Sequence, residues 1–167
     1  MAAALAAQGH VHITDDISVI GFQPNGEAAV YPGTHMMKLG SDSSTALGLK
    51  TDRNQAPIGP RGKRLYGSRS AVEAGGPTKL AAVYMLELAG EADIVIEPLA
   101  GAKAIAALTS QIYRRPWLSP MRLAEARLQD VVRLALQIPC FRLKRPHRFD
   151  QLPKVLEAVA RHRETLP

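Results

Sequence analysis

Two adjacent carboxylates, Asp15 and Asp16, are the residues whose type and spacing could do chemistry most directly in this chain. A carboxylate beside the phosphates of a nucleotide can hold Mg²⁺, directly or through water. A neighbouring carboxylate can accept the proton of an attacking hydroxyl. Because adjacent side chains of a regular strand point to opposite faces, the chain must bend here for both to serve one site. The alternative is a polar turn between two hairpin strands.

Other polar residues could assist such a site. The candidates for binding a phosphate or nucleotide are basic residues near loops, namely Lys63, Arg64 and Arg69. Ordinary exposed charge is the alternative for these three. His10 and His12 would share one face of a strand, and His35 could complete a three-ligand metal site. No cysteine or carboxylate spacing supports that metal site.

A small-residue helix over Ala2–Gln8, the pair Gly9-His10, a short β-run and then Asp15-Asp16 follow one another at the start of the chain. This order resembles the HPr kinase/phosphorylase family and its bacterial relatives. In that family a Gly-rich phosphate loop ending in Gly-Lys-Ser/Thr opens the helix. The resemblance continues more weakly through Tyr31-Pro32-Gly33, the Lys63-Arg64 strand and the C-terminal helix.

The resemblance implies an α/β fold over residues 1–167 as a single domain, like the P-loop catalytic domain of HPr kinases and PEP carboxykinases without its first strand and phosphate loop. It implies ATP- and Mg²⁺-dependent phosphorylation of a serine hydroxyl on a protein or peptide, HPr-like or other. Asp15 and Asp16 would be the metal ligands and the catalytic base, with the division of these roles open. Members of the wider group act in sugar regulation and in peptide tailoring, and the sequence does not choose between them.

Parts of the family pattern are missing from these residues. Counting back from Gly9-His10, Met1 falls on the residue directly after the family's Gly-Lys-Ser/Thr, and no complete phosphate loop occurs elsewhere. The stretch from Gly59 to Arg64 has a Gly-Lys pair without the hydroxyl residue, and Pro60 removes an N–H donor. The family's downstream Glu-x-Arg-Gly segment has no counterpart, which argues against phosphorylase activity. We expect weak nucleotide binding and little phosphoryl transfer from this chain alone.

The elements that must position the acidic pair are strands in the front half and helices in the back half. A helix over 1–8 should end at Gly9, and two short strands over 10–22 should meet at the pair. Pro24-Asn25-Gly26 predicts a hairpin turn before a strand at 28–31. Further strands are expected at 35–39, 63–66, 80–88, 94–97 and 140–143, and helices at 41–47, 98–114, 119–137 and 149–163. The third of these helices should start at Ser119-Pro120 and bury Leu123, Ala126, Leu134 and Ile138.

Composition sets the remaining limits. The 167 residues are 46% apolar, enough for one domain with a core, and Cys140 is the only cysteine, which excludes a disulfide framework. No run of about 18 apolar residues occurs, and the start lacks a signal peptide's basic residues, so we expect a cytoplasmic protein with no membrane partner. The net charge is +6, with basic residues dense from Arg114 to Arg163. We interpret them as a solvated face without interleaved aromatics, which disfavours nucleic acid as a partner.

Three hypotheses of function remain open at this point. The chain is a fragment or mis-started copy of an active kinase whose upstream coding sequence holds the phosphate loop. Alternatively, it is a non-catalytic regulatory or binding remnant of that fold, or a basic nucleic-acid-binding module. A homo-oligomer is compatible with each of them.

Overall fold

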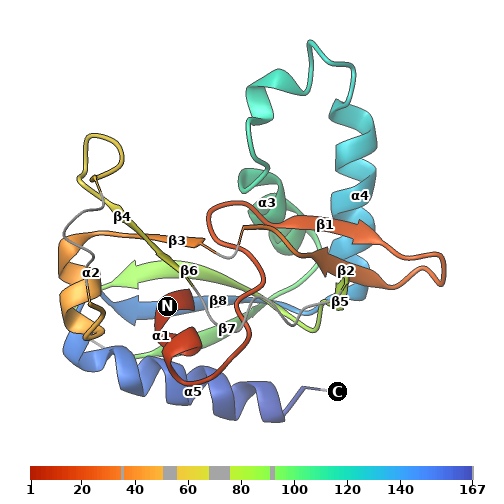
Figure 1. The fold of residues 1–167 in the computed structure, drawn as a ribbon. Helices are drawn as coiled ribbons and strands as arrows, with labels where there is room; N and C mark the ends of the chain where they lie inside the picture. The colour runs from red at the N-terminus through yellow and green to blue at the C-terminus, as the bar shows by residue number, and fades with distance from the viewer. Residues whose placement is uncertain (35, 51–55, 68–75, 91–92, 167) are drawn as a thin grey trace. The chain divides into compact units, whose positions relative to one another are not determined.

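The computed structural model describes residues 1–34, 36–50, 56–67, 76–90 and 93–166, which form a mixture of helices and short strands (Figure 1). The chain divides into two compact units. Unit 1 comprises Met1–Gly21, Val30–Thr78 and Arg148–Pro167, and unit 2 comprises Phe22–Ala29 and Lys79–His147. The expected α/β class is confirmed at this coarse level.

The first helix, α1 (Ala2–Ala7), ends as predicted at Gly9. Gly9 has a φ of +93°, a backbone conformation that glycine adopts without steric cost. The N–H of Gly9 donates to the carbonyl of Ala6, and the N–H of His10 donates to the carbonyl of Leu5. These two bonds form a Schellman motif, which satisfies carbonyls at the helix end and turns the chain out of the helix.

Unit 1 contains an antiparallel pair of strands, β3 (Met36–Leu39) and β4 (Arg64–Gly67), with Lys38 opposite Leu65 and Leu39 opposite Arg64. It also contains α2 (Ser41–Ala46), the 3₁₀ turn η3 (Phe149–Gln151) and the C-terminal helix α5 (Leu152–Glu164). The N-cap of α2 is Gly40, and no side chain caps this helix by a hydrogen bond. Helix α5 buries Val155 and Leu156.

A hairpin formed by β1 (Val19–Phe22) and β2 (Ala28–Tyr31) continues to the short strand β5 (Thr78–Lys79) in a three-stranded sheet. Its turn follows the predicted signal: Gly26 has a φ of +85°, and the Asn25 side chain accepts a hydrogen bond from the N–H of Glu27. The first of the two strands expected over 10–22 is wrong, because residues 10–18 join no strand. Around Asp15 the chain forms a local hydrogen bond, from the Thr14 hydroxyl to the Ile17 carbonyl, instead of the backbone bonds of a β-strand.

Unit 2 is organised around β8 (Cys140–Pro146), which lies between β6 (Val83–Ala89) and β7 (Val95–Leu99), as Figure 1 shows. Strand β8 runs parallel to β6 and antiparallel to β7. Its central position explains its burial: Leu143 is fully buried, and Cys140 and Phe141 are nearly so. Helices α3 (Ala102–Ser110) and α4 (Ala124–Gln137) pack against each other in the same unit.

Two helix boundaries in unit 2 differ from those predicted. The helix expected from residue 98 begins only at Ala102, because Pro98 and Leu99 pair with β8 at the end of β7. The helix expected from Ser119 begins only at Ala124. Arg122 interrupts it with a φ of +56°, outside the range of a right-handed helix.

The predicted buried stripe of α4 is partly wrong. Leu134 and Ile138 are buried as expected, but Val131 occupies the third buried position. Leu123 is only half-buried and precedes the helix, while Ala126 is exposed.

Candidate functional site

The acidic pair lies in a bend between α1 and β1, which we call the acidic bend (residues 14–17). The Thr14 hydroxyl donates to the carbonyl of Ile17 at 2.7 Å and closes the bend locally. The N–H of Gly33 donates to the carbonyl of Ile13 at 3.0 Å and ties the entry of the bend to the segment after β2. All these residues belong to unit 1.

Both carboxylates of the acidic bend reach the same residue, Lys38 in β3. Asp15 Oδ2 accepts a hydrogen bond from the Lys38 backbone N–H at 2.9 Å. Asp16 Oδ2 lies 3.2 Å from Lys38 Nζ and forms a salt bridge with it. A regular strand would point these two side chains to opposite faces. The bend therefore brings both side chains to Lys38, Asp15 at its backbone N–H and Asp16 at its ammonium group.

The two contacts with Lys38 differ in strength. The Asp16–Lys38 salt bridge is solvent-exposed, with 56% and 44% of the two side chains accessible, and such pairs contribute about 0–1 kcal/mol. The Asp15 bond uses a backbone N–H of a strand and is charge-assisted, a class with about twice the strength of neutral bonds. Asp15 thus fastens the bend to β3, whereas Asp16 can exchange its lysine for another cation at little cost.

The sequence did not single out Lys38. It lies in the predicted strand at 35–39 between apolar neighbours, in the order Met36-Met37-Lys38-Leu39. A cation inside an otherwise apolar short strand was the available signal. The cross-chain pairing that brings it to Asp15 and Asp16 could not be inferred from spacing, because 22 residues separate Lys38 from Asp16.

The predicted phosphate-binding cations do not gather at the acidic bend. Arg64 opens β4 opposite Leu39, so it points from the other face of the two-stranded sheet than Lys38 does. Lys63 directly precedes β4, and its carbonyl accepts a bond from the N–H of Ile58. Arg69 lies outside the described residues. The register of the β3–β4 pair therefore leaves Lys38 as the cation of the bend.

The histidines do not form the metal pair considered above. His12 is 5% exposed whereas His10 is exposed, so the two do not present a common face to solvent. His35 lies outside the described residues. No group of three or more histidine, cysteine, aspartate or glutamate side chains able to hold a metal ion occurs in the described part of the chain.

The acidic bend fits one type of metal binding. Mg²⁺ commonly takes one or two carboxylates and completes its shell with substrate phosphates and water. Asp15 and Asp16 match that requirement, because they provide two carboxylates adjacent in sequence, and the Asp16 side chain is 56% exposed. They do not match a site made by protein ligands alone. The residues thus fit a metal delivered with a nucleotide.

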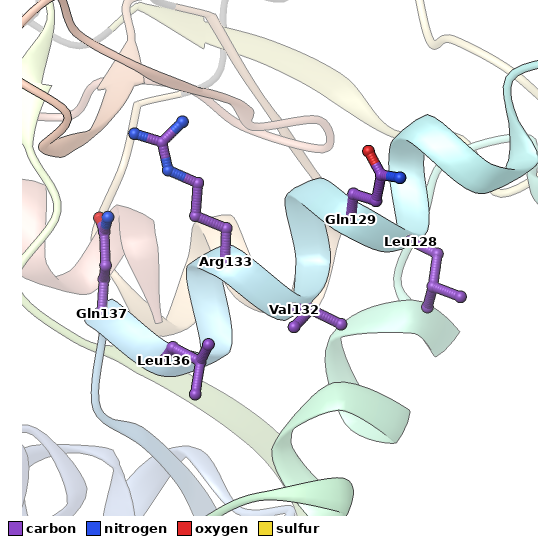
Figure 2. Close-up of a pocket in the computed structure, with 6 residues that line it drawn as sticks. All are labelled: Leu128, Gln129, Val132, Arg133, Leu136 and Gln137. Carbon is purple, nitrogen blue, oxygen red and sulfur yellow. The ribbon is translucent and has the colours of Figure 1, made fainter.

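A second surface feature is a shallow hollow along α4 (Figure 2). Figure 2 shows Leu128, Val132 and Leu136 pointing to one side of the helix and Arg133 and Gln137 to the other.

The polar side of this helix anchors the hairpin tip of unit 2. The Arg133 guanidinium lies 3.8 Å from the centre of the Phe22 ring, and Arg133 and Gln137 both donate to the carbonyl of Gly26. The hollow's lining contains no carboxylate, histidine, cysteine or hydroxyl that could act as an acid, base or nucleophile.

No protein-family model matches the chain, and neither a curated protein nor a solved structure was found to match it. Within the described residues, no helix combines the length and the apolar character needed to cross a membrane.

Proposed function

We propose that this chain acts in an HPr-kinase-like phosphotransferase and that its acidic bend binds the Mg²⁺ of a nucleotide. The observation that carries the proposal is the convergence of Asp15 and Asp16 on Lys38. Adjacent carboxylates serve one site only where the chain bends, and it bends here. ATP as the nucleotide, and a serine hydroxyl of a protein or peptide as the acceptor, follow from the family resemblance.

The unequal contacts with Lys38 assign different roles to the two aspartates. Asp16 is the metal ligand, because its exposed salt bridge is easily exchanged. Asp15 is fastened by one oxygen to the β3 backbone, and its carboxylate retains a second oxygen that can accept the proton of a hydroxyl. Bound Mg²⁺ would neutralise charge on the phosphates. Lys38 would then be released from Asp16 and could approach a phosphate oxygen.

The proposal can be tested on the chain itself with Mn²⁺, a paramagnetic ion that accepts the same carboxylate and water ligands as Mg²⁺. In amide NMR spectra recorded with ADP, we expect Mn²⁺ to broaden the signals of residues 14–17 and Lys38 first. Asp16→Asn should remove this selective broadening. Asp42→Asn is the matched control, because it removes one exposed acid of unit 1 in the first turn of α2 and should leave the broadening intact.

Uniform broadening, or selective broadening that survives Asp16→Asn, would refute the metal site.

A second experiment separates catalysis from a non-catalytic remnant. In a chain joined behind a Gly-rich phosphate loop, phosphoryl transfer from ATP to serine peptides should depend on both aspartates. Metal binding at the bend without any transfer by the loop-joined chain would favour the regulatory remnant.

A further inference from the structure

The connection between α3 and α4 carries a group of exposed arginines and large apolar side chains, which we call the arginine–aromatic loop (residues 113–122). Tyr113, Trp117 and Met121 are 57%, 60% and 60% exposed. Arg114, Arg115 and Arg122 lie between and beside them. Figure 1 shows this connection extending beyond the ends of α3 and α4. Exposed aromatic rings thus accompany these arginines, contrary to the expectation from the sequence.

The charge of this loop is not balanced by its surroundings in the sequence. Residues 98–124 contain no aspartate or glutamate but include four cations, Lys103, Arg114, Arg115 and Arg122. Across the described residues, the three loop arginines form no ion pair, whereas other arginines do: Arg127 pairs with Asp130, Arg142 with Glu87 and Arg148 with Asp150. The loop therefore presents positive charge that no carboxylate of the described residues pairs with.

The backbone of the loop is strained at two of these arginines. Arg114 and Arg122 have φ values of +51° and +56°, and they are the non-glycine residues with positive φ in the described part of the chain. A side chain in this conformation crowds the following carbonyl, a cost that glycine avoids. Arginine at both positions thus opposes local stability. Strain of this kind gathers where a side chain is used for binding.

One arginine is also held in place before any partner arrives. The Arg114 guanidinium lies 5.2 Å from the centre of the Tyr113 ring, and its Nε donates to the Tyr113 hydroxyl at 3.0 Å. The bond to Tyr113 uses one of the five N–H donors of the guanidinium, so the donors on its two terminal nitrogens remain for a partner. An ordered arginine loses less conformational entropy when it binds a carboxylate.

We propose that the arginine–aromatic loop binds an acidic segment of a partner protein. Tyrosine, tryptophan, methionine and arginine are the residues enriched in protein interfaces, and the loop combines all four without a lysine. Its positive charge requires an acidic partner. Nucleic acid fits less well, because Arg114 already covers the Tyr113 ring and Met121 offers no stacking platform. A lipid surface fits less well, because the apolar side chains alternate with cations instead of lining one helix face.

The test uses short fluorescent peptides in which Asp and Glu surround a central Leu or Phe, and the same peptides with Lys in place of the acids. The acidic peptides should bind, and binding should weaken with salt. Trp117→Ala should weaken it about tenfold or more. Leu136→Ala, an even more exposed apolar site on α4, and Arg161→Gln, an exposed arginine of α5, are control variants that should change it little.

Arg114→Gly and Arg122→Gly separate binding from folding. Glycine removes the guanidinium but suits the backbone, so these variants should lose binding while their melting temperature stays equal or rises. A merely structural role would lower the melting temperature. The proposal is overturned if acidic and basic peptides bind alike, or if the loop variants bind as the parent does. It is also overturned if phosphatidylserine vesicles or oligothymidine bind through Trp117 and the acidic peptides do not. These assays need no nucleotide, so their outcome does not depend on the proposed kinase function.

Discussion

The substitution Gly33→Ala tests whether the acidic bend is supported as the structure indicates. A Cβ added at Gly33 would overlap the Thr14 Oγ1 and lie 3.0 Å from the Thr14 Cβ. The Thr14 hydroxyl can move away only by giving up its bond to Ile17, worth about 0.5–1.5 kcal/mol. The remaining crowding at the Thr14 Cβ adds to this, and overpacking generally costs about 1–3 kcal/mol. We expect the unfolding free energy to fall by roughly 1.5–4.5 kcal/mol.

Denaturant unfolding of the variant and the parent measures this loss. Gly76→Ala is the control within unit 1, because the Cβ added there meets no atom of the described residues within 4 Å. The Lys38 amide signal should shift in Gly33→Ala, because displacement of Thr14 moves the adjacent Asp15 away from that N–H. In a Thr14→Ala background the cost of Gly33→Ala should shrink, since the overlapping hydroxyl is gone.

Equal stability of Gly33→Ala and the parent, or an equal cost with and without the Thr14 hydroxyl, would refute this account of the bend. Equal stability would mean that the segment after β2 and the bend move apart without loss, and an equal cost in both backgrounds would mean that the Thr14 hydroxyl is not the group that the new Cβ displaces. The convergence of Asp15 and Asp16 on Lys38 would then lack its support.

Two more predictions concern the acid titration of Asp150 in unit 1 and the core of unit 2. Two hydrogen bonds from Arg148 lower the pKa of Asp150 to about 2. The stability that this carboxylate contributes is therefore present above its unfolded pKa of 3.8 and is lost as pH falls toward 2. In Arg148→Gln, carboxyl NMR should show the Asp150 pKa near its ordinary value, and an unchanged pKa would contradict the pairing. Because Leu143 is fully buried, Leu143→Ala should lower the unfolding free energy by about 2–5 kcal/mol. Burial raises the pKa of the Cys140 thiol in the same strand, so the reaction of this thiol with a disulfide reagent should be slow. The reaction should accelerate by about 30-fold or more in Leu143→Ala. An unchanged rate would show that β8 is not the centre of the core.

Local features were read correctly from the sequence because their causes are local. Gly9 ends α1 with a left-handed residue, and Pro24-Asn25-Gly26 makes the hairpin turn. Each depends on the conformations available to one glycine and its neighbours. The strands around Leu65 and Leu143 followed in the same way from runs of residues that favour extended backbone.

Predictions failed where a distant partner decided the outcome. Pro98 and Leu99 looked helical but pair with β8, some 40 residues later in the chain, and this ladder delays the start of α3. The strand expected before Asp15 did not form, because the backbone there bonds locally and to Gly33 instead of to a neighbouring strand. Arg122 broke the helix expected from Ser119 through a positive φ, which residue type alone does not indicate.

The acidic pair shows the same division. The sequence by itself determined that two adjacent carboxylates follow the first helix and that they require a bend to act together. Only the tertiary structure decided that the bend exists, that both carboxylates meet Lys38, and that Arg64 points from the other face of the β3–β4 pair. The physical reason is that hydrogen bonds between segments far apart in the chain set strand register, and register decides which side chains share a face.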